Sequence, residues 1–536
     1  MGETLVCTSV TAPTAAAALR DFHTAAAAGA DVVELRLDLL DAGEAWEPLL
    51  DASPLPVIVT NRAAWEGGRC TLPEADRLAS LARAAASGAA FVDVELAAAA
   101  AYVAAHGAPA TAAAAGGGGL GAGDAGRGGK RGGGCRLILS HHNFERALSH
   151  DEAAKVYADA VAAGADVVKV AMAATSAADV GVVFDLLSAA RVPTIALSMG
   201  ERGVITRILT PKYGGFLTFT SVAAGAESAP GQLDTATLLS AYPFRSITPA
   251  TAVYGVIGCP IGHSMSPVLH NAALGAAAVD AVYVPLLVDD GDLERFLAAV
   301  RPYGFAGFSV TLPHKLAALT AVGEAVDPVA ARIGAVNTLV SDNAAACGYR
   351  GYNTDWTGAL DAVEERRALQ GAAVMVLGAG GAGRALAFGA VARGAGLVII
   401  INRSLDKARA LAAELRTDTC PAVAATPAAA LDLPSVAQVD VVMNSTSVGM
   451  APDVDATPVD AALFRKRDCP LVFDAVYNPL ETRLLREAAA AGCVTVSGVE
   501  MFVRQAAAQF RLWLPTVPPD VQLMRTVVLA ALDKKK

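Results

Sequence analysis

The sequence contains no long uncharged apolar run and no excess of basic residues. Its 536 residues include 42 Lys or Arg and 52 Asp or Glu, which gives a net charge of −10. A chain with this charge is repelled by nucleic acid and by anionic membranes, and a membrane span would need an apolar run of about 20 residues. We therefore expect no nucleic-acid partner and no membrane segment. An anionic substrate would need arginines and lysines gathered at its site.

Closely spaced cysteines are also lacking, since the eight cysteines are scattered and none forms a Cys-x-x-Cys pair. In a chain of this size, such scatter is typical of reduced, buried thiols and not of a disulfide framework or a zinc site. The first residues, Met1 to Thr4, lead directly into a predicted strand, so we expect no signal peptide. These absences predict a soluble intracellular enzyme of two or three domains without a metal ion.

Short runs of β-branched and aliphatic residues recur in the first half, most of them separated by alanine-rich helical stretches. The runs cover residues 5–10, 32–37, 57–60, 91–95, 136–139, 167–170, 194–197 and 216–219. Eight strand–helix units in about 230 residues match the size and rhythm of a (β/α)8 barrel. We therefore predict an α/β fold that begins with such a barrel over residues 1–240.

Lys169 lies in the middle of the sixth run, where a fully buried strand is expected. Removing an ammonium group from water disfavours its charged form, so a buried lysine can act as a nucleophile and form a Schiff base with a ketone. Other polar residues follow the strand ends, on the face that carries the active site in this fold. They are Glu34, Arg36, Arg62, Glu95, His142, Arg207, Ser228 and Gln232. An ion-pair network, including a salt-bridged lysine, is the alternative explanation.

Residues 106–134 interrupt this pattern between the fourth and fifth runs. They are rich in glycine and alanine and have no hydrophobic periodicity. Such a composition predicts a disordered insertion that the barrel tolerates. A phosphate-binding role is the weaker alternative, because no strand and helix flank these glycines.

After a linker at residues 241–250, polar residues again follow strand-like segments. They are Ser264, Ser266, Thr311, Lys315, Asn337 and Asp355, and we assign them to a substrate-binding lobe over residues 251–358. A lysine and an aspartate in one small lobe suit proton transfer coupled to a carbonyl group. Ser266 precedes Pro267 and could also cap a helix.

A glycine-rich turn follows an apolar strand and precedes a helix, as in dinucleotide-binding Rossmann folds. It consists of Gly378, Ala379, Gly380, Gly381, Ala382 and Gly383. The pyrophosphate would bind at the helix N-terminus. About 20 residues later, where NAD enzymes usually carry an acid, the sequence reads Asn402-Arg403-Ser404. Because Arg403 can pair with a 2′-phosphate, we predict NADP(H) in a lobe over residues 359–498; a surface arginine is the alternative.

Four segments of the first half resemble type I dehydroquinate dehydratase, and the resemblance covers nearly all of that half. They are Glu34-Leu35-Arg36-Leu37-Asp38, Ser140-His141-His142-Asn143-Phe144, Asp166-Val167-Val168-Lys169 and Ser228-Ala229-Pro230-Gly231-Gln232. The resemblance implies a Schiff base on Lys169 and acid–base catalysis by His142, with Glu95 supporting the histidine. It also implies a substrate carboxylate on Arg207. The ring hydroxyls would contact Glu34, Arg36, Arg62, Ser228 and Gln232.

The second half looks like shikimate dehydrogenase. The matching segments are 264–267, 310–315, 353–355, 378–383, 444–450 and 498–501, together with Gln505. The resemblance implies Lys315 and Asp355 as the catalytic pair. The implied substrate contacts are Ser264, Ser266, Thr311, Asn337 and Gln505. The implied cofactor contacts are the glycine turn, Asn402, Arg403, Ser404, Thr446 and Met501, and a C-terminal helix within 499–536 would return to the substrate lobe.

Joined in this order, the halves resemble the bifunctional dehydroquinate dehydratase–shikimate dehydrogenases of plants and algae. The resemblance implies an enzyme that converts 3-dehydroquinate to 3-dehydroshikimate and then, with NADPH, to shikimate, and we expect a monomer. It also implies a plastid location if a transit peptide was removed, and otherwise a cytoplasmic one. Alternatives are a quinate dehydrogenase in the second half, a chain with one active half, or a sensor of NADP without turnover.

Overall fold

The computed structural model describes residues 3–107, 134–262, 264–465 and 469–533. Residues 108–133, which make up most of the predicted insertion, lie outside the described residues. The chain divides into two compact units. Unit 1 comprises Met1–Val253, Pro260–Gly262 and Asp280–Gly304, and unit 2 comprises Tyr254–Cys259, His263–Val279 and Phe305–Lys536.

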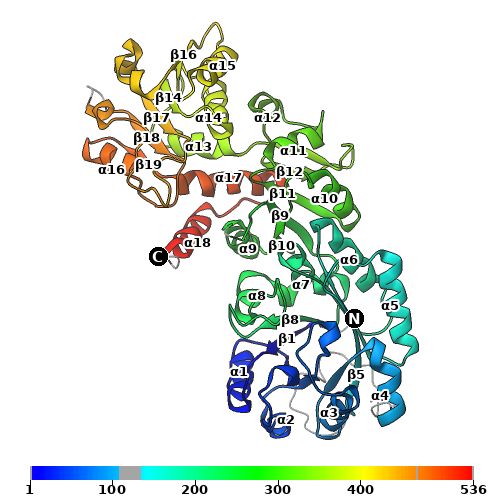
Figure 1. The fold of residues 1–536 in the computed structure, drawn as a ribbon. Helices are drawn as coiled ribbons and strands as arrows, with labels where there is room; N and C mark the ends of the chain where they lie inside the picture. The colour runs from blue at the N-terminus through cyan, green and yellow to red at the C-terminus, as the bar shows by residue number, and fades with distance from the viewer. Residues whose placement is uncertain (1–2, 108–133, 263, 466–468, 534–536) are drawn as a thin grey trace. The chain divides into compact units, whose positions relative to one another are not determined.

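Eight parallel strands form the sheet of unit 1, in the order β7-β6-β5-β4-β3-β2-β1-β8. Their bounds are β1 Leu5–Val10, β2 Val32–Arg36, β3 Val57–Thr60, β4 Phe91–Glu95, β5 Arg136–Asn143, β6 Val167–Ala173, β7 Thr194–Met199 and β8 Leu217–Ser221. Because β1 pairs with β8, the sheet turns back on itself (Figure 1). At the remaining edge, the Phe216 N–H donates to the Thr194 carbonyl at 2.8 Å. The predicted barrel is thus confirmed as a nearly closed one.

Helices alternate with these strands and cover their outer side (Figure 1). They are α1 Ala15–Ala27, α2 Glu47–Ala52, α3 Glu74–Ala86, α4 Ala99–His106, α5 His150–Ala162, α6 Val180–Ala189, α7 Val204–Ile208 and α8 Thr235–Ala241. Gly29, Gly88 and Gly164 follow α1, α3 and α5 with φ of 95°, 100° and 87°. This left-handed backbone is the usual helix stop, and it turns the chain into the next strand.

Alternate side chains of each strand point into the barrel, where they form layers. An apolar layer includes Val32, Ile58, Phe91, Ile138 and Val167. Two residues further along the same strands, the side chains are polar. They are Glu34, Thr60, Asp93, Ser140 and Lys169, and all are buried. The barrel therefore carries a polar layer directly above an apolar one.

The next sheet has five strands, in the order β10-β9-β11-β12-β13. These strands are β9 Ala252–Gly258, β10 Ala281–Leu287, β11 Phe305–Val310, β12 Thr338–Ser341 and β13 Tyr349–Tyr352. The accompanying helices are α9 Ser266–Ala276, α10 Leu293–Val300, α11 Lys315–Val322 and α12 Pro328–Ile333. The β11–β12 and β12–β13 pairs are antiparallel. Thr311 directly follows β11 and Asn337 directly precedes β12, so this sheet carries two of the predicted substrate-binding residues at the ends of its strands.

A six-stranded parallel sheet follows, in the order β16-β15-β14-β17-β18-β19. Its strands are β14 Ala373–Leu377, β15 Leu397–Ile401, β16 Ala422–Ala425, β17 Val441–Asn444, β18 Leu471–Asp474 and β19 Thr495–Val496. The order reverses at β14, as in Rossmann folds. Apolar clusters cover both faces, under helices that include α13 Asp355–Glu364, α14 Gly381–Ala392, α15 Leu405–Leu415 and α16 Arg483–Ala490. The predicted Rossmann lobe is confirmed.

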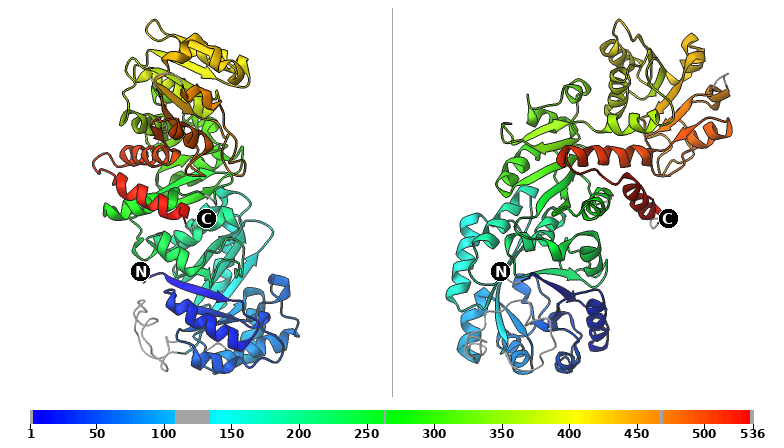
Figure 2. Two further views of the ribbon diagram at one scale, coloured as in Figure 1. Left: turned by 90° about the vertical axis from the view of Figure 1, so that its left-hand side faces the viewer. Right: turned by 180° about the vertical axis from the view of Figure 1, so that it is seen from behind.

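Two helices end the described chain, α17 Gly498–Trp513 and α18 Val521–Asp533. α17 packs along α13, and its last turn donates a hydrogen bond from the Trp513 indole to the Leu339 carbonyl of β12, at 3.0 Å. α18 packs on α17 and α9, as the view from behind shows (Figure 2). Among the described residues, no helix has both the length and the apolar character needed to cross a bilayer.

The cysteine prediction is wrong for one pair, because Cys469 and Cys493 form a disulfide. Cys469 precedes β18, and Cys493 precedes β19, which pairs with β18 in parallel. Parallel pairing brings the starts of these strands together, so their Cα atoms lie 5.0 Å apart although 24 positions separate them in sequence. The remaining cysteines, Cys7, Cys70, Cys135, Cys259, Cys347 and Cys420, are free.

The turn between β14 and α14 yields a stability prediction. A Cβ at Gly383 would lie 2.2 Å from the Gly378 carbonyl oxygen, whereas a Cβ at Gly381 would meet nothing within 4 Å. Gly383→Ala should therefore destabilise unit 2 by roughly 1–3 kcal/mol through overpacking. Gly381→Ala should be neutral or stabilising by up to about 1 kcal/mol. Hydrogen exchange of α14 during chemical unfolding measures both; equal protection in the two variants would contradict the close packing.

Candidate active sites

Lys169 of β6 points into the barrel and is 5% exposed. Its ammonium donates a hydrogen bond to Asp93 Oδ2 at 2.7 Å and lies 3.8 Å from Glu34 Oε1. The ring centre of Phe219 lies 4.4 Å from Nζ. The expected buried lysine is therefore present, but its surroundings are ionic as well as apolar. Asp93, which sequence reasoning missed, faces the lysine because it has the same inward register as Phe91 and Glu95.

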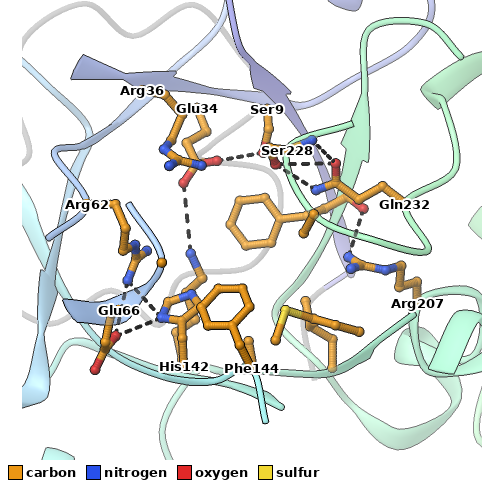
Figure 3. Close-up of a pocket in the computed structure, with 17 residues that line it drawn as sticks. Ser9, Glu34, Arg36, Arg62, Glu66, His142, Phe144, Arg207, Ser228 and Gln232 are labelled. Atoms are coloured by element: carbon orange, nitrogen blue, oxygen red, sulfur yellow. Dashed lines mark hydrogen bonds and ion pairs between the residues drawn. The ribbon is translucent and has the colours of Figure 1, made fainter. Parts of the chain in front are cut away.

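The pocket that contains Lys169 opens at the carboxyl ends of the strands (Figure 3). It brings together all but one of the predicted barrel residues: Glu34, Arg36, Arg62, His142, Lys169, Arg207, Ser228 and Gln232. Ser9, Glu66 and Phe144 also line it. Glu95 does not. The convergence of side chains from most of the strands on one cavity is the arrangement expected of an active site in this fold.

Glu66, and not Glu95, contacts His142. The Glu66 carboxyl group lies 3.0 Å from His142 Nδ1 (Figure 3). Arg62 Nη1 lies 2.8 Å from the same nitrogen. The prediction that Glu95 supports the histidine is therefore wrong. Glu66 belongs to the short helical turn at 64–66 that follows β3, four residues after Arg62, and that spacing was the available signal.

The Glu95 carboxylate has other partners, and its nearest contact with the pocket is Arg62 Nη1 at 3.8 Å. It accepts hydrogen bonds from the Ala63 N–H at 2.9 Å and from Arg77 Nη1 at 2.6 Å. Arg77 also donates to the Asn61 carbonyl at 2.8 Å. Glu95 and Arg77 therefore hold the backbone on both sides of Arg62. A cation from α3 thus determines where this acid points, and no property of β4 alone reveals it.

Burial governs the protonation of the histidine and its acid. Burial lowers the pKa of His142 well below its usual range, and the charges of Arg62 and Lys169 add to this. Burial raises the pKa of Glu66 to about 8, although Arg62 opposes the shift. Burial would also raise the pKa of Asp93, but Arg62 and Lys169 outweigh it and hold that pKa well below its usual range. At neutral pH the site therefore holds a neutral imidazole beside a protonated Glu66 and an ionised Asp93.

Arg207 is a buried cation without an acidic partner among the described residues. It is 2% exposed, and within the described residues it donates only long hydrogen bonds, to the carbonyls of Phe219 and Pro230 at 3.4 Å and 3.5 Å. Its Nε has no partner within the described chain, and burial lowers the pKa of Arg207 to about 10. Such a guanidinium is suited to bind an anion in the pocket.

The other predicted rim residues are engaged with each other. Arg36 donates two hydrogen bonds to Asp38, at 2.9 Å and 2.7 Å. Gln232 Nε2 donates to Ser228 Oγ at 3.0 Å, and the Ser228 N–H donates to Gln232 Oε1 at 2.8 Å (Figure 3). These groups lie where they could exchange partners with hydroxyls of a bound ring.

The second site lies in unit 2, where Lys315 opens α11 and Asp355 opens α13. Lys315 Nζ donates to Asp355 Oδ2 at 2.6 Å, and Asn337 Nδ2 donates to Asp355 Oδ1 at 2.8 Å. Both carboxylate oxygens are thus occupied by donors. The lysine side chain is 30% exposed, so a substrate can reach it.

The remaining predicted substrate contacts lie on neighbouring elements. The Ser266 N–H, at the start of α9, donates to Ser264 Oγ at 3.3 Å. Thr311 directly follows β11, and its N–H donates to the Ile257 carbonyl at 2.9 Å. Gln505 lies on α17, where its backbone N is 2.5 Å from the position of a Cβ built on Gly358. Gly358 therefore allows α17 to approach α13 one turn after Asp355.

The glycine turn is shaped to receive a dinucleotide. Gly378 has φ of 107°, and a Cβ there would lie 2.5 Å from Ser445 Oγ. Gly380 and Gly381 have open space where a Cβ would be, and no side chain caps the start of α14. The N–H groups at this helix start are therefore available for a pyrophosphate.

The residues expected around the rest of the cofactor lie beside this turn. Asn402 Oδ1 accepts a hydrogen bond from the Ala379 N–H at 3.3 Å, and Arg403 and Ser404 are exposed at the end of β15. Thr446, after β17, donates to Asn444 Oδ1 at 2.7 Å. Met501 is partly buried against the Rossmann core. The described residues contain no group of three or more His, Cys, Asp or Glu side chains that could hold a metal ion.

Comparisons with known families cover most of the chain. Residues 6–249 match type I 3-dehydroquinase, and residues 256–339 match the shikimate dehydrogenase substrate binding domain. Residues 361–479 match shikimate / quinate 5-dehydrogenase, and residues 498–529 match the shikimate 5'-dehydrogenase C-terminal domain. The matched segments follow the order of the barrel, the five-stranded sheet, the Rossmann sheet and the last helices.

Individual relatives match one half or the whole chain. The shikimate dehydrogenase (NADP(+)) of Methanosarcina mazei is 43% identical over 283 residues, which cover 52% of this chain and 99% of the relative. A crystal structure of shikimate 5-dehydrogenase from Thermus thermophilus with NADP(H) and shikimate is 36% identical, with a TM-score of 0.45, and covers 52% of this chain and 99% of that one. The chloroplastic bifunctional enzyme of Arabidopsis thaliana is 40% identical over 531 residues, 95% of this chain and 82% of the relative. The chain therefore belongs to the family of bifunctional 3-dehydroquinate dehydratase/shikimate dehydrogenases.

Proposed function

We propose that unit 1 dehydrates 3-dehydroquinate to 3-dehydroshikimate and that unit 2 reduces this product to shikimate with NADPH. The observation that carries the first step is the position of Lys169, which shares one cavity with His142 and Arg207. The observation that supports the second is the Lys315–Asp355 pair, on the same unit as the open glycine turn. Membership of the bifunctional family supports both steps in one chain.

Dehydration begins when the Lys169 amine attacks the substrate ketone. Asp93 and Glu34 lie beside the ammonium and position it, and a proton must leave Nζ before attack. Condensation releases one water and leaves a protonated imine, which withdraws electrons from the neighbouring carbon. His142 removes a proton from that carbon and returns one to the departing β-hydroxyl, so a second water leaves. Hydrolysis of the imine then restores the lysine.

The surrounding side chains bind and orient the substrate. Arg207, with its unused donors, would pair with the ring carboxylate. Arg36, Arg62, Ser228, Gln232 and Glu34 would take the hydroxyls. Glu66 would hold the His142 ring through Nδ1, a role that the resemblance had assigned to Glu95.

In unit 2, Lys315 and Asp355 would move the proton of the substrate oxygen. Asn337, Ser264, Ser266, Thr311 and Gln505 would hold the ring and its carboxylate. When bound, NADPH supplies the hydride. The open backbone at Gly380 and Gly381 would hold its pyrophosphate, and the exposed Arg403 and Ser404 would hold its 2′-phosphate, with Asn402, Thr446 and Met501 as further contacts.

We further propose a division into a barrel at 1–240, a linker at 241–250, lobes at 251–358 and 359–498, and a C-terminal segment at 499–536. The net charge of −10 supports a monomer with small-molecule substrates and without nucleic-acid or membrane partners. The chloroplastic location of the Arabidopsis relative supports a plastid location, with the cytoplasm as the alternative. The match to shikimate / quinate 5-dehydrogenase makes quinate the rival substrate, so rates with both compounds must be compared.

Separate sites predict separable activities. Lys169→Ala should reduce dehydration to background and leave NADP-dependent shikimate oxidation intact, whereas Asp355→Asn should do the reverse, with a loss of about 10²- to 10⁴-fold. Borohydride with 3-dehydroquinate should leave a mass adduct on Lys169. Lys155→Ala, at an exposed lysine paired with Asp159, is the control. Loss of both activities in either variant would contradict separate sites.

The raised pKa of Glu66 predicts the pH dependence of dehydration. Above about pH 8 Glu66 loses its proton, and the resulting carboxylate stabilises the imidazolium that forms as His142 takes a proton. Because the pKa of His142 is lowered, its imidazole is already neutral at pH 6.5, so its titration causes no increase in kcat/KM near that pH. kcat/KM should therefore rise through about pH 8 in the wild type. Glu66→Gln should abolish this rise, and an unchanged profile would assign it to another group.

The exposed arginine after β15 predicts the choice of cofactor. Arg403→Ala should raise the KM for NADP about 10- to 100-fold, because a charged hydrogen bond to the 2′-phosphate is lost. The KM for NAD should change little. Arg486→Ala, at an exposed arginine of α16, should leave both values unchanged. An equal effect of Arg403→Ala on NADP and NAD would show that the arginine does not read the phosphate.

A further inference from the structure

The side-chain amide of Asn337 is held in one orientation. Its Oδ1 accepts hydrogen bonds from the Thr338 hydroxyl and the Thr354 N–H, each at 2.7 Å, and from the Thr354 hydroxyl at 3.2 Å. Its Nδ2 is left to donate to Asp355 Oδ1 at 2.8 Å. A flipped amide would place Oδ1 against the carboxylate and Nδ2 against these donors. The donors of Thr338 and Thr354 therefore fix Oδ1 on their side of the amide, and the Nδ2 amide group must face Asp355.

Gln509 of α17 determines the direction in which the Thr338 hydroxyl donates its hydrogen bond. Thr338 is fully buried, and Gln509 Nε2 donates to its Oγ1 at 3.1 Å. An amide nitrogen only donates, so the hydroxyl must give its own proton to another acceptor. The closest acceptor is Asn337 Oδ1. The hydrogen bonds therefore run in one sense from Gln509 through Thr338 to Asn337.

Gln509 is itself oriented at both ends of its amide. Its Oε1 accepts from the Ser309 hydroxyl at 2.8 Å, and its Nε2 also donates to the Asn337 carbonyl at 3.3 Å. The side chain is 2% exposed, so water does not compete for these partners. A buried, directed chain of hydrogen bonds thus joins α17 to the Asp355 carboxylate.

We propose that Thr338 is a positioning residue of the reductase, whose hydroxyl fixes the Asn337 amide and through it the Asp355 carboxylate. Asp355 Oδ2 can then remain on Lys315 while Oδ1 is held by Asn337. Without the Thr338 hydroxyl, only the Thr354 donors hold Asn337 Oδ1, so the amide holds the Asp355 carboxylate less firmly against the substrate oxygen. This inference rests on the proposed roles of Lys315 and Asp355.

Two variants at one position test the proposal in the full chain. Thr338→Val keeps the side-chain shape and removes the hydroxyl, and it should lower kcat for shikimate oxidation about 10- to 100-fold. Thr338→Ser keeps the hydroxyl and should stay within about threefold of the wild type. The KM for NADP and the dehydratase rate should not change in either variant, because the glycine turn and the barrel are untouched.

The outcomes separate the proposal from the proposed function. A wild-type chain that oxidises neither shikimate nor quinate would overturn both. If the wild type is active, two results would overturn the positioning role alone. One is a kcat of Thr338→Val within twofold of the wild-type kcat. The other is a kcat of Thr338→Ser as low as that of Thr338→Val. If Thr338→Val does not fold, Gln509→Met removes the donor to Thr338 and should also lower kcat with an unchanged KM for NADP. Wild-type kcat in Gln509→Met would then overturn the proposal.

Discussion

The dehydratase site depends on the ion pair between Lys169 and Asp93 inside the barrel wall. A buried ammonium is costly unless a carboxylate faces it, and Asp93 supplies one at 2.7 Å. The same carboxylate binds Arg62 at 2.9 Å and accepts the Ser140 hydroxyl at 2.6 Å. One acid on β4 thereby holds Ser140 of β5, Lys169 of β6 and Arg62, which follows β3. Asp93 therefore positions Lys169 together with Arg62, the neighbour of His142.

In both sites, buried polar groups whose hydrogen bonds are all satisfied hold the side chains that line the pocket. In the barrel, the Ala63 N–H and the Arg77 guanidinium occupy the Glu95 carboxylate, and this fixes the backbone that carries Arg62. In unit 2, buried donors and acceptors surround the Asn337 amide. Polar groups that are satisfied in this way have few alternative arrangements. Pre-organisation of this kind lets the reacting side chains keep their geometry before a substrate arrives.

The alternation of strands and helices along the sequence predicted the barrel and the Rossmann lobe. The strand ends of β2 and β6 placed Glu34 and Lys169 in one pocket, the family resemblance selected His142 over His141, and the strand–glycine–helix order identified the Rossmann turn. Glu66 was missed because it lies in a short helical turn after β3, where strand periodicity does not apply and only its spacing from Arg62 could have indicated it. Glu95 was misassigned because a contact from α3 decides its partner. The disulfide was missed because it depends on which strands are neighbours, which spacing along the chain does not reveal.

The position of α17 has a consequence for the order in which the activities arise during synthesis. All of the barrel residues that line the dehydratase pocket precede residue 233, and β8 closes on β1 before that point. Gln505 and Gln509, which we propose as a substrate contact and as a buried support of the reductase, both lie on α17, which leaves the ribosome after the whole barrel. A nascent chain can thus complete its lyase pocket while its oxidoreductase pocket still lacks a wall.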